Sequence, residues 1–285
     1  LNKSFDKIIL HNFTTLTGIL AIKYLKIHSI GYYIESDGGF IKTEHRWKRI
    51  FKSILLNGAI KYFSTAEAND DYFISYNIPQ NRIVRYPFTS IYNQDVLSSV
   101  LSVEEKRNIK NQLGITEKTV VLAVGRIIPI KGYDILIEAS KLLSKDVGIY
   151  IVGGKAPQEY VTEIEQHKLF NIHFVDFQLK GVLSQYYMAA DMFVHPTRSD
   201  VWGLVINEAM AKGLPIVTTN KCVAGLELVK DGINGHIVPA NDKEALAKAI
   251  QDTLCDAQNM SVKSLKIIKN YTIEKMARIH FELLK

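Results

Sequence analysis

The chain has 285 residues, of which 47% are apolar and 22% charged, with 35 Lys and Arg against 29 Asp and Glu. This composition excludes a disordered chain and is sufficient for two globular domains. The net charge of +6 suits an anionic ligand or membrane surface, whereas the lack of a zinc-finger spacing or a long basic run argues against nucleic acid.

Strand-like apolar runs alternate with helical stretches along the whole chain, which predicts an α/β fold with parallel sheets. In the first part, strands are expected at 7–11, 32–35, 62–65 and 82–86, with helices at 16–27, 45–57 and 67–76. The stretch 87–102 has no clean period and is predicted to be a linker that completes an N-terminal domain, 1–102.

A second block of alternating elements follows, predicted as a C-terminal domain at 103–270 with a closing helix in 271–285. Strands are expected at 119–125, 149–152, 172–175, 192–195, 215–218 and 236–238. Helices are expected at 103–113, 133–143, 183–190, 204–212, 243–254, 262–269 and 273–284. Ligands of such sheets bind beyond the carboxyl ends of the strands, so the cleft between two Rossmann-like halves is the predicted site.

Two further features bear on the origin of the chain. Cys222 and Cys255 are far apart and lack a metal-ligand spacing, which predicts reduced thiols in a cytoplasmic protein. The chain begins at Leu1 and enters almost directly into a buried strand, so we expect the start of the N-terminal domain to be missing.

The segment 197–215 combines two acids with a glycine where a helix should begin. Asp200 lies in a loop, Gly203 and Leu204 follow, and Glu208 lies inside the helical run. Free N–H groups at a helix N-terminus attract phosphate, and carboxylates accept hydrogen bonds from sugar hydroxyls. The alternative is an ordinary helix, capped by Asp200 and with Glu208 in solvent.

A second candidate is the loop after the strand 119–125. Arg126 follows Gly125 at the end of that strand, and Lys131 opens the next helix. Arg can engage phosphate oxygens in pairs and Lys supplies a compact charge, as a diphosphate requires. The alternative is two solvated cations, but the helix dipole disfavours cations there, which favours a bound anion.

These residues and several shorter motifs resemble retaining glycosyltransferase family 4, also known as glycosyl transferases group 1. The motifs are Gly125-Arg126 with Lys131-Gly132, the acid-x7-Glu pair of Asp200 and Glu208, Val152-Gly153-Gly154, Tyr187-Met-Ala-Ala-Asp191, His195-Pro196, Glu208-Ala-Met-Ala-Lys-Gly213 and Asp231-Gly232-Ile-Asn-Gly235. The resemblance implies the GT-B fold, in which two Rossmann-like domains face each other across a cleft. It also implies that the closing helix packs on the N-terminal domain.

By this resemblance the chain moves a sugar from a nucleotide-diphosphate-sugar to a hydroxyl acceptor, in polysaccharide or glycolipid synthesis. Arg126, Lys131 and Asp200 would be catalytic, with the two cations stabilising the departing nucleotide in place of a metal. The donor would be bound by Gly125, Gly203, Leu204 and Glu208, the last on the ribose. No cofactor or metal is expected.

The sequence departs from the family at two places. The family has Glu where this chain has Asp200, so the carboxylate is one methylene shorter. Family members often carry a His after the second strand of this half; the nearest equivalents are Ser36 and Asp37, and Asp37 is either a donor contact or part of a turn. His195 ends an apolar strand, where a histidine with a satisfied partner is the more common case.

The segment 44–56 is amphipathic, basic and aromatic. It either rests on anionic lipid, at the inner face of the membrane and near a saccharide or lipid-linked acceptor, or covers the sheet with its cations in solvent. Two other functions stay open: a nucleotide-sugar-binding remnant without turnover, and an epimerase or phosphorylase of the same fold.

Overall fold

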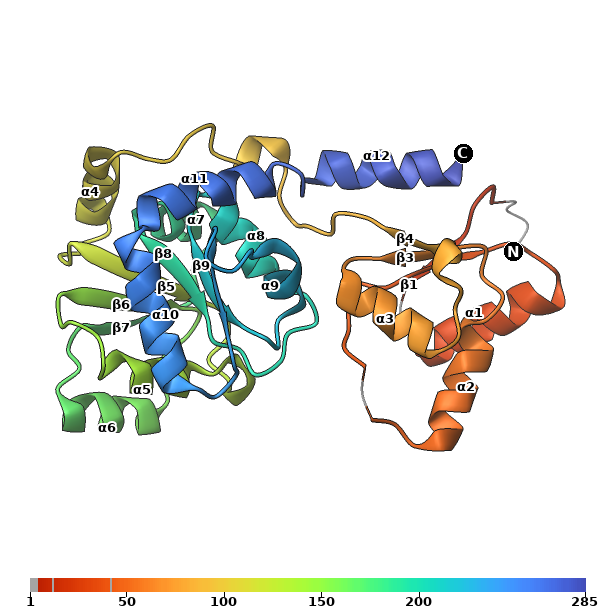
Figure 1. Cartoon of the computed structure of the whole chain (residues 1–285), viewed down its shortest axis with the longest axis horizontal. Coiled ribbons are helices and arrows are strands. Elements are labelled where there is room, and N and C mark those ends of the chain that lie inside the picture. The colour runs from red at the N-terminus through yellow and green to blue at the C-terminus, as the bar shows by residue number, and fades with distance from the viewer. Residues whose placement is uncertain (1–4, 12, 42) are drawn as a thin grey trace. The chain divides into compact units, whose positions relative to one another are not determined.

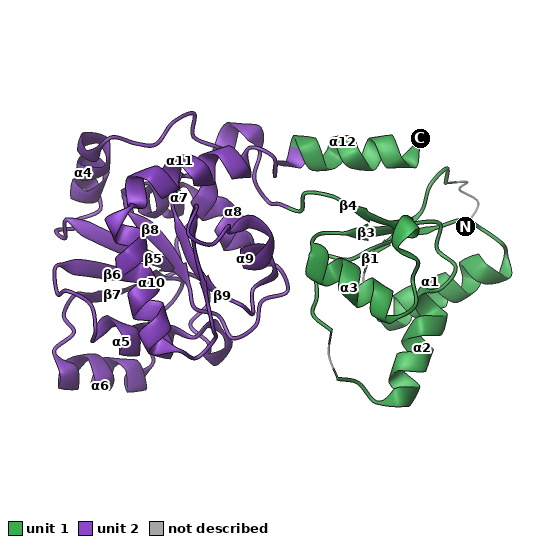
Figure 2. Ribbon diagram, viewed as in Figure 1, with its two compact units in different colours: residues 1–88, 274–285 green, residues 89–273 purple. Residues whose placement is uncertain are grey.

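The computed structural model describes residues 5–11, 13–41 and 43–285, and the chain forms two compact units (Figure 2). The N-terminal unit consists of Leu1–Phe88 and Glu274–Lys285, and the C-terminal unit of Thr89–Ile273. Among the described residues, no helix is both long enough and apolar enough to cross a membrane.

The N-terminal unit contains a parallel sheet in the order β1-β2-β3-β4. Its strands are β1 (Ile9–His11), β2 (Tyr33–Glu35), β3 (Tyr62–Ser64) and β4 (Ile83–Arg85). The connecting helices are α1 (Leu16–Ile27), α2 (Arg46–Leu56) and α3 (Glu67–Ser75), with a 3-10 turn η1 (Gln80–Arg82) before β4. The last helix, α12 (Ile273–Leu284), packs Met276, Ile279 and Leu283 against a cluster that contains Tyr33 and Phe63.

The segment after β4 belongs to the C-terminal unit, so the structure divides the chain at 88–89, whereas the sequence places the boundary after 102. Hydrogen bonds explain this assignment. The Leu97 N–H donates to Ala211 O at 2.9 Å, and Lys212 Nζ donates to Asp95 O at 2.6 Å. The stretch without a period, with its 3-10 turn η2 (Asn93–Asp95), therefore covers a helix of the C-terminal unit.

The C-terminal unit contains a six-stranded parallel sheet in the order β10-β9-β8-β5-β6-β7 (Figure 1). Its strands are β5 (Thr119–Val124), β6 (Val147–Val152), β7 (Ile172–Val175), β8 (Met192–His195), β9 (Ile216–Thr219) and β10 (Gly235–Val238). Its helices are α4 (Val103–Gln112), α5 (Tyr133–Ser140), α6 (Gln158–His167), α7 (Lys180–Ala189), α8 (Leu204–Ala211), α9 (Val223–Leu228), α10 (Lys243–Cys255) and α11 (Ala257–Ile268). A 3-10 turn, η3 (Pro129–Lys131), precedes α5.

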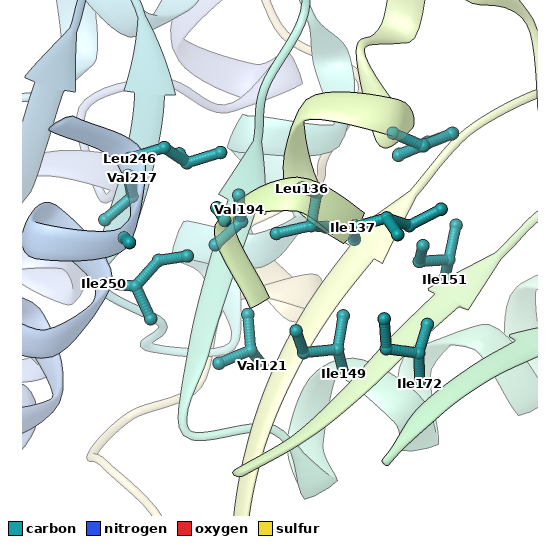
Figure 3. Packing of buried hydrophobic residues seen from close by; sticks show 14 of the residues in the cluster. Val121, Leu136, Ile137, Ile149, Ile151, Ile172, Val194, Val217, Leu246 and Ile250 are labelled. Carbon is teal, nitrogen blue, oxygen red and sulfur yellow. The ribbon is translucent and has the colours of Figure 1, made fainter. Parts of the chain in front are cut away.

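The core of the C-terminal unit lies between the sheet and the helices that cover it. Figure 3 shows Val121, Ile149 and Ile172 from neighbouring strands facing Leu136 and Ile137 of α5. The central strands are apolar almost throughout because both faces of a parallel sheet are buried. Burying one such side chain contributes about 1.5–3 kcal/mol, so this core fixes the strand ends that carry the site.

The element types agree with those predicted from the sequence, and the bounds of α1 and α12 coincide with the predicted ones. The largest differences are in helices. α11 begins at Ala257 and not at 262 as predicted. The sequence pattern missed its first turn because that turn is polar and has no apolar period. The pattern does not single out α6 or α9; α9 spans only six residues, too few to show a helical period.

Candidate functional site

The carboxyl ends of β5 and β8 are neighbours at the point where the strand order reverses. From β5 the chain continues to β6 and β7 on one side, and from β8 to β9 and β10 on the other. Ligands of open α/β sheets bind at such a reversal because the two outgoing loops diverge there. The loops are 125–132 and 196–203, and they carry Gly125, Arg126, Lys131, Asp200 and Gly203.

The structure brings Lys131 and Asp200 together. Lys131 Nζ donates to Asp200 Oδ2 at 2.6 Å, and His195 Nε2 lies 2.9 Å from the same oxygen. Since an ionised carboxylate only accepts hydrogen bonds, Nε2 of His195 carries the proton. His195 is 1% exposed, and burial lowers the pKa of its imidazole, which favours the neutral form. The result is a partly buried group with one cation, one anion and one neutral ring.

The ionisation of Asp200 is controlled by its two partners. Burial opposes the charged form, but hydrogen bonds from His195 and Lys131 outweigh it and lower the pKa of Asp200 to about 2. Asp200 is therefore an anion at neutral pH, and both donors use Oδ2. Within the described residues, Oδ1 accepts no hydrogen bond from a protein group, so it is available to a ligand hydroxyl.

Helix α8 begins at Leu204, four residues after Asp200. Its N-cap, Gly203, has φ 101° and ψ 61°, and no side chain caps the helix. The first N–H groups of a helix have no acceptor inside it. A Cβ at Gly203 would lie 2.8 Å from Cys222 Sγ, so glycine is required both by the left-handed backbone and by the space available. Leu204 is the first residue of α8, and its N–H is one of these free donors.

Arg198 holds the two loops together. Its guanidinium forms a paired contact with Asp134, with Nη1–Oδ1 at 2.9 Å and Nη2–Oδ2 at 2.5 Å, and it also donates to Pro129 O. The Arg198 N–H donates to Ile130 O at 2.8 Å. Because these bonds tie the turn that ends at Lys131 to the loop that carries Asp200, they fix the ion pair between them.

Gly125 and Arg126 lie directly at the end of β5. The Gly125 N–H donates to Val152 O at 2.9 Å, which extends the sheet by one hydrogen bond. Arg126 is exposed, and within the described residues its guanidinium has no ion pair or hydrogen bond to the protein. Unlike Lys131, Arg126 therefore has its full donor capacity available to a ligand.

Glu208 lies one turn into α8, in a cavity of about 340 Å³. Tyr187 Oη donates to Glu208 Oε2 at 3.0 Å, and burial raises the pKa of the Glu208 carboxyl. Ile91, Phe177 and Leu183 form an apolar wall, and the lining also contains the charged residues Asp95, Lys180 and Lys212. A cavity with carboxyl groups and an apolar wall suits a ring with hydroxyl groups attached.

Some functional contacts of the structure have no clear signal in the sequence. Tyr187 and Arg198 reach their partners, Glu208 and Asp134, only through the packing of separate elements. Asp37 lies in the turn after β2, where Ser36 Oγ donates to Gly38 O at 3.1 Å, and it belongs to the N-terminal unit. In the described part of the chain, no group of three or more His, Cys, Asp or Glu side chains could hold a metal ion.

Comparison with known proteins decides the family. The profile described as "Glycosyl transferases group 1" matches residues 105–274, more than half of the chain. The chain belongs to this family. The match contains every site residue of the C-terminal unit named above except Ile91 and Asp95, which precede it.

Sequence relatives of this group 1 chain include an "Uncharacterized glycosyltransferase" of Haemophilus influenzae, 28% identical over 63% of the chain and 53% of the relative. A D-inositol 3-phosphate glycosyltransferase of Actinosynnema mirum is 33% identical over 51% of the chain and 38% of the relative. The chain thus spans about half, or less, of the length of these curated relatives.

Solved structures of similar fold include Anabaena HepE in complex with UDP, with a TM-score of 0.81 and 21% identity over 97% of this chain and 78% of HepE. Sucrose-phosphate synthase from Thermosynechococcus elongatus has a TM-score of 0.79 and 21% identity over 98% of this chain and 73% of that one. These likenesses confirm the predicted GT-B class, an α/β fold with two parallel sheets.

Proposed function

We propose that this group 1 family member is a retaining glycosyltransferase that moves a sugar from a nucleotide-diphosphate-sugar to a hydroxyl acceptor. One observation carries the proposal. Three groups follow each other at the strand reversal. They are the cation Lys131, the uncapped N-terminus of α8 and, one turn along this helix, the cavity that contains the Glu208 carboxyl group. A ligand with phosphate beside a hydroxylated ring matches that sequence of groups. The bound UDP of HepE supports a uridine nucleotide.

In this proposal Arg126 and Lys131 bind the diphosphate. Charge accumulates on the departing nucleotide in the transition state, and fixed cations stabilise it, a role that needs no metal. Lys131 is oriented by Asp200 before the donor binds, so little reorganisation is needed. Gly125 allows the phosphates to approach the end of β5, and the Gly203–Leu204 N–H groups donate to the donor.

Asp200 and Glu208 take different parts of the donor. Oδ1 of Asp200 accepts from a hydroxyl of the transferred sugar, which its shorter side chain reaches directly or through a water. Glu208 accepts from the ribose hydroxyls inside its cavity, with the Phe177 side of the cavity against the base. Asp37 stays a prediction as a donor contact. The acceptor is a saccharide or lipid-linked hydroxyl in polysaccharide or glycolipid synthesis, on the cytoplasmic side.

The test replaces the unpaired cation first. Arg126→Ala removes an exposed side chain without a protein partner, so it should leave unfolding unchanged and lower turnover about 10²–10³-fold, as for loss of one transition-state donor. Lys131→Gln should do the same with some loss of stability, because Asp200 loses its cation. Lys145→Ala, which changes an exposed cation away from the site, is the control.

Turnover is measured with labelled UDP-sugars and a panel of hydroxyl acceptors, following release of UDP. Release only in the presence of acceptor supports transfer and separates it from epimerisation, which releases no nucleotide. Full activity of Arg126→Ala would sink the diphosphate assignment. Calorimetric binding of UDP-sugar with no transfer to any acceptor would instead support a binding protein without turnover.

A further inference from the structure

The exposed side of α2 is apolar. Trp47, Phe51 and Ile54 lie on one stripe of this helix and are 74%, 51% and 65% exposed, whereas Leu55 and Leu56 in its last turn are buried in the core. Globular helices turn their polar side to water. A helix that exposes a second apolar stripe in addition to its buried one has an apolar surface that a binding partner can remove from water.

The neighbouring helix α1 has the same property. Ile22 and Leu25 are buried, while Leu20, Tyr24 and Ile27 are all more than half exposed. The two helices are joined, because Lys26 Nζ of α1 donates to Ile54 O of α2 at 2.6 Å and to Leu55 O at 3.3 Å. Both lie in the same part of the N-terminal unit (Figure 1).

The charge on these helices has one sign. Residues 16–27 and 46–56 contain six cations and no Asp or Glu. Lys52 is paired with Glu44, and Arg49 donates to Ser75 O at 2.8 Å. Lys23 and Arg46 are exposed, and the side chain of Lys48 is 65% exposed and 3.9 Å from Glu44. An anionic partner would thus meet at least three cations beside the apolar stripes.

From these observations we propose that the outer surface of α1 and α2 docks on an anionic lipid bilayer. This surface, here named the α1–α2 face, consists of Leu20, Tyr24, Ile27, Trp47, Phe51 and Ile54 with the flanking cations Lys23, Arg46 and Lys48. Aromatic and aliphatic side chains enter the boundary between headgroups and acyl chains, and the cations attract anionic headgroups. The proposal goes beyond the transfer reaction and does not depend on it.

Charge decides between a bilayer and a second copy of this chain. In a symmetric dimer through the α1–α2 face, the same cations would approach each other with no acid on these helices to compensate. Like charges across an interface cost several kcal/mol. An anionic membrane avoids that repulsion, and a fluid bilayer has no fixed shape that the two helices must match.

The experiment mixes the whole chain with vesicles of phosphatidylcholine alone or vesicles rich in phosphatidylglycerol, followed by flotation. Binding is expected to the anionic vesicles only and to weaken with salt. The chain has two tryptophans, and Trp202 is only 3% exposed. A blue shift of emission on binding therefore reports Trp47.

Variants test both parts of the face. Trp47→Ser with Phe51→Ser should abolish binding, and Arg46→Gln with Lys48→Gln should weaken it roughly 30-fold, at about five-fold per cation near the surface. Phe170→Ser, which removes an aromatic ring that is 72% exposed in the C-terminal unit, and Lys145→Gln with Lys248→Gln are the matched controls. They should bind like the unaltered chain.

Three results would overturn the proposal. One is no binding of the unaltered chain to anionic vesicles, and another is equal loss in the Phe170→Ser control. The third is a dimer in gel filtration that becomes a monomer in the Trp47/Phe51 variant, which would assign the face to a second copy. Because vesicle binding needs no donor, failure here leaves the transfer proposal standing, and full activity of Arg126→Ala, which would overturn the diphosphate assignment, leaves this one standing.

Discussion

Replacing Gly203 by alanine should destabilise the C-terminal unit by several kcal/mol. Gly203 is the N-cap of α8 with φ 101°, and a Cβ there would lie 2.8 Å from Cys222 Sγ. The left-handed backbone costs a residue with a Cβ about 1–2 kcal/mol. Cys222 is fully buried and cannot move into solvent, and overpacking of this kind costs about 1–3 kcal/mol. The sum is about 2–5 kcal/mol.

Three matched variants separate the two contributions. Gly232→Ala meets nothing within 4 Å but has φ 71°, so it should show the backbone cost alone. Gly181→Ala lies in α7 with open space and no positive φ, and should stabilise by about 0.5–1 kcal/mol. Adding Cys222→Ala to Gly203→Ala should recover the contact cost and leave the backbone cost.

The assay is urea unfolding followed by the fluorescence of Trp202, which is buried in the C-terminal unit, in a Trp47→Phe background. With one tryptophan left, the signal reports the C-terminal unit and avoids a mixture of two unfolding units. A Gly203→Ala variant within about 0.5 kcal/mol of its parent, a typical surface effect, would refute the reasoning about this N-cap.

Two further predictions concern ion pairs. His280 Nε2 lies 3.0 Å from Glu35, and this hydrogen bond raises the pKa of the imidazole. That stabilisation is complete below the ordinary value of 6.5 and is lost as pH rises through the higher folded pKa. The protection factors of the α12 amides, which correct for base-catalysed intrinsic exchange, should therefore fall between pH 6.5 and alkaline pH, but not in His280→Gln. Protection factors independent of pH in both chains would contradict this. For Arg198 and Asp134, a double-mutant cycle to Ala should give a coupling of about 1 kcal/mol, limited by partial exposure; no coupling in urea unfolding would remove Arg198 as the clamp of the two loops.

The sequence alone was sufficient for the fold class and for most elements. Apolar runs of strand length that alternate with helical periods leave few options besides a parallel α/β sheet, because both faces of each central strand must be buried. The sequence also indicated where glycine is needed. Gly125, Gly132 and Gly203 each follow a strand or open a helix, where backbone geometry excludes most other residues.

The sequence did not show to which domain the stretch 89–102 belongs. This stretch resembles a linker because its contacts are hydrogen bonds to α8 and Lys212, which leave no hydrophobic period in the sequence. The sequence predicted that 44–56 has an apolar side, but it did not predict that this side faces solvent. Periodicity gives the width of an apolar stripe and not its direction, which depends on the helices and strands packed behind it.

For the site too, the sequence predicted the candidate residues but not the contacts between them. Residue types and spacing single out Arg126, Lys131, Asp200 and Glu208 as candidates, since phosphate and hydroxyl ligands require cations and carboxylates. Only the tertiary structure places Lys131 and His195 on the same oxygen of Asp200, and Glu208 in a separate cavity with Tyr187. Such pairings join residues from different elements, and the strand order that brings β5 beside β8 decides them.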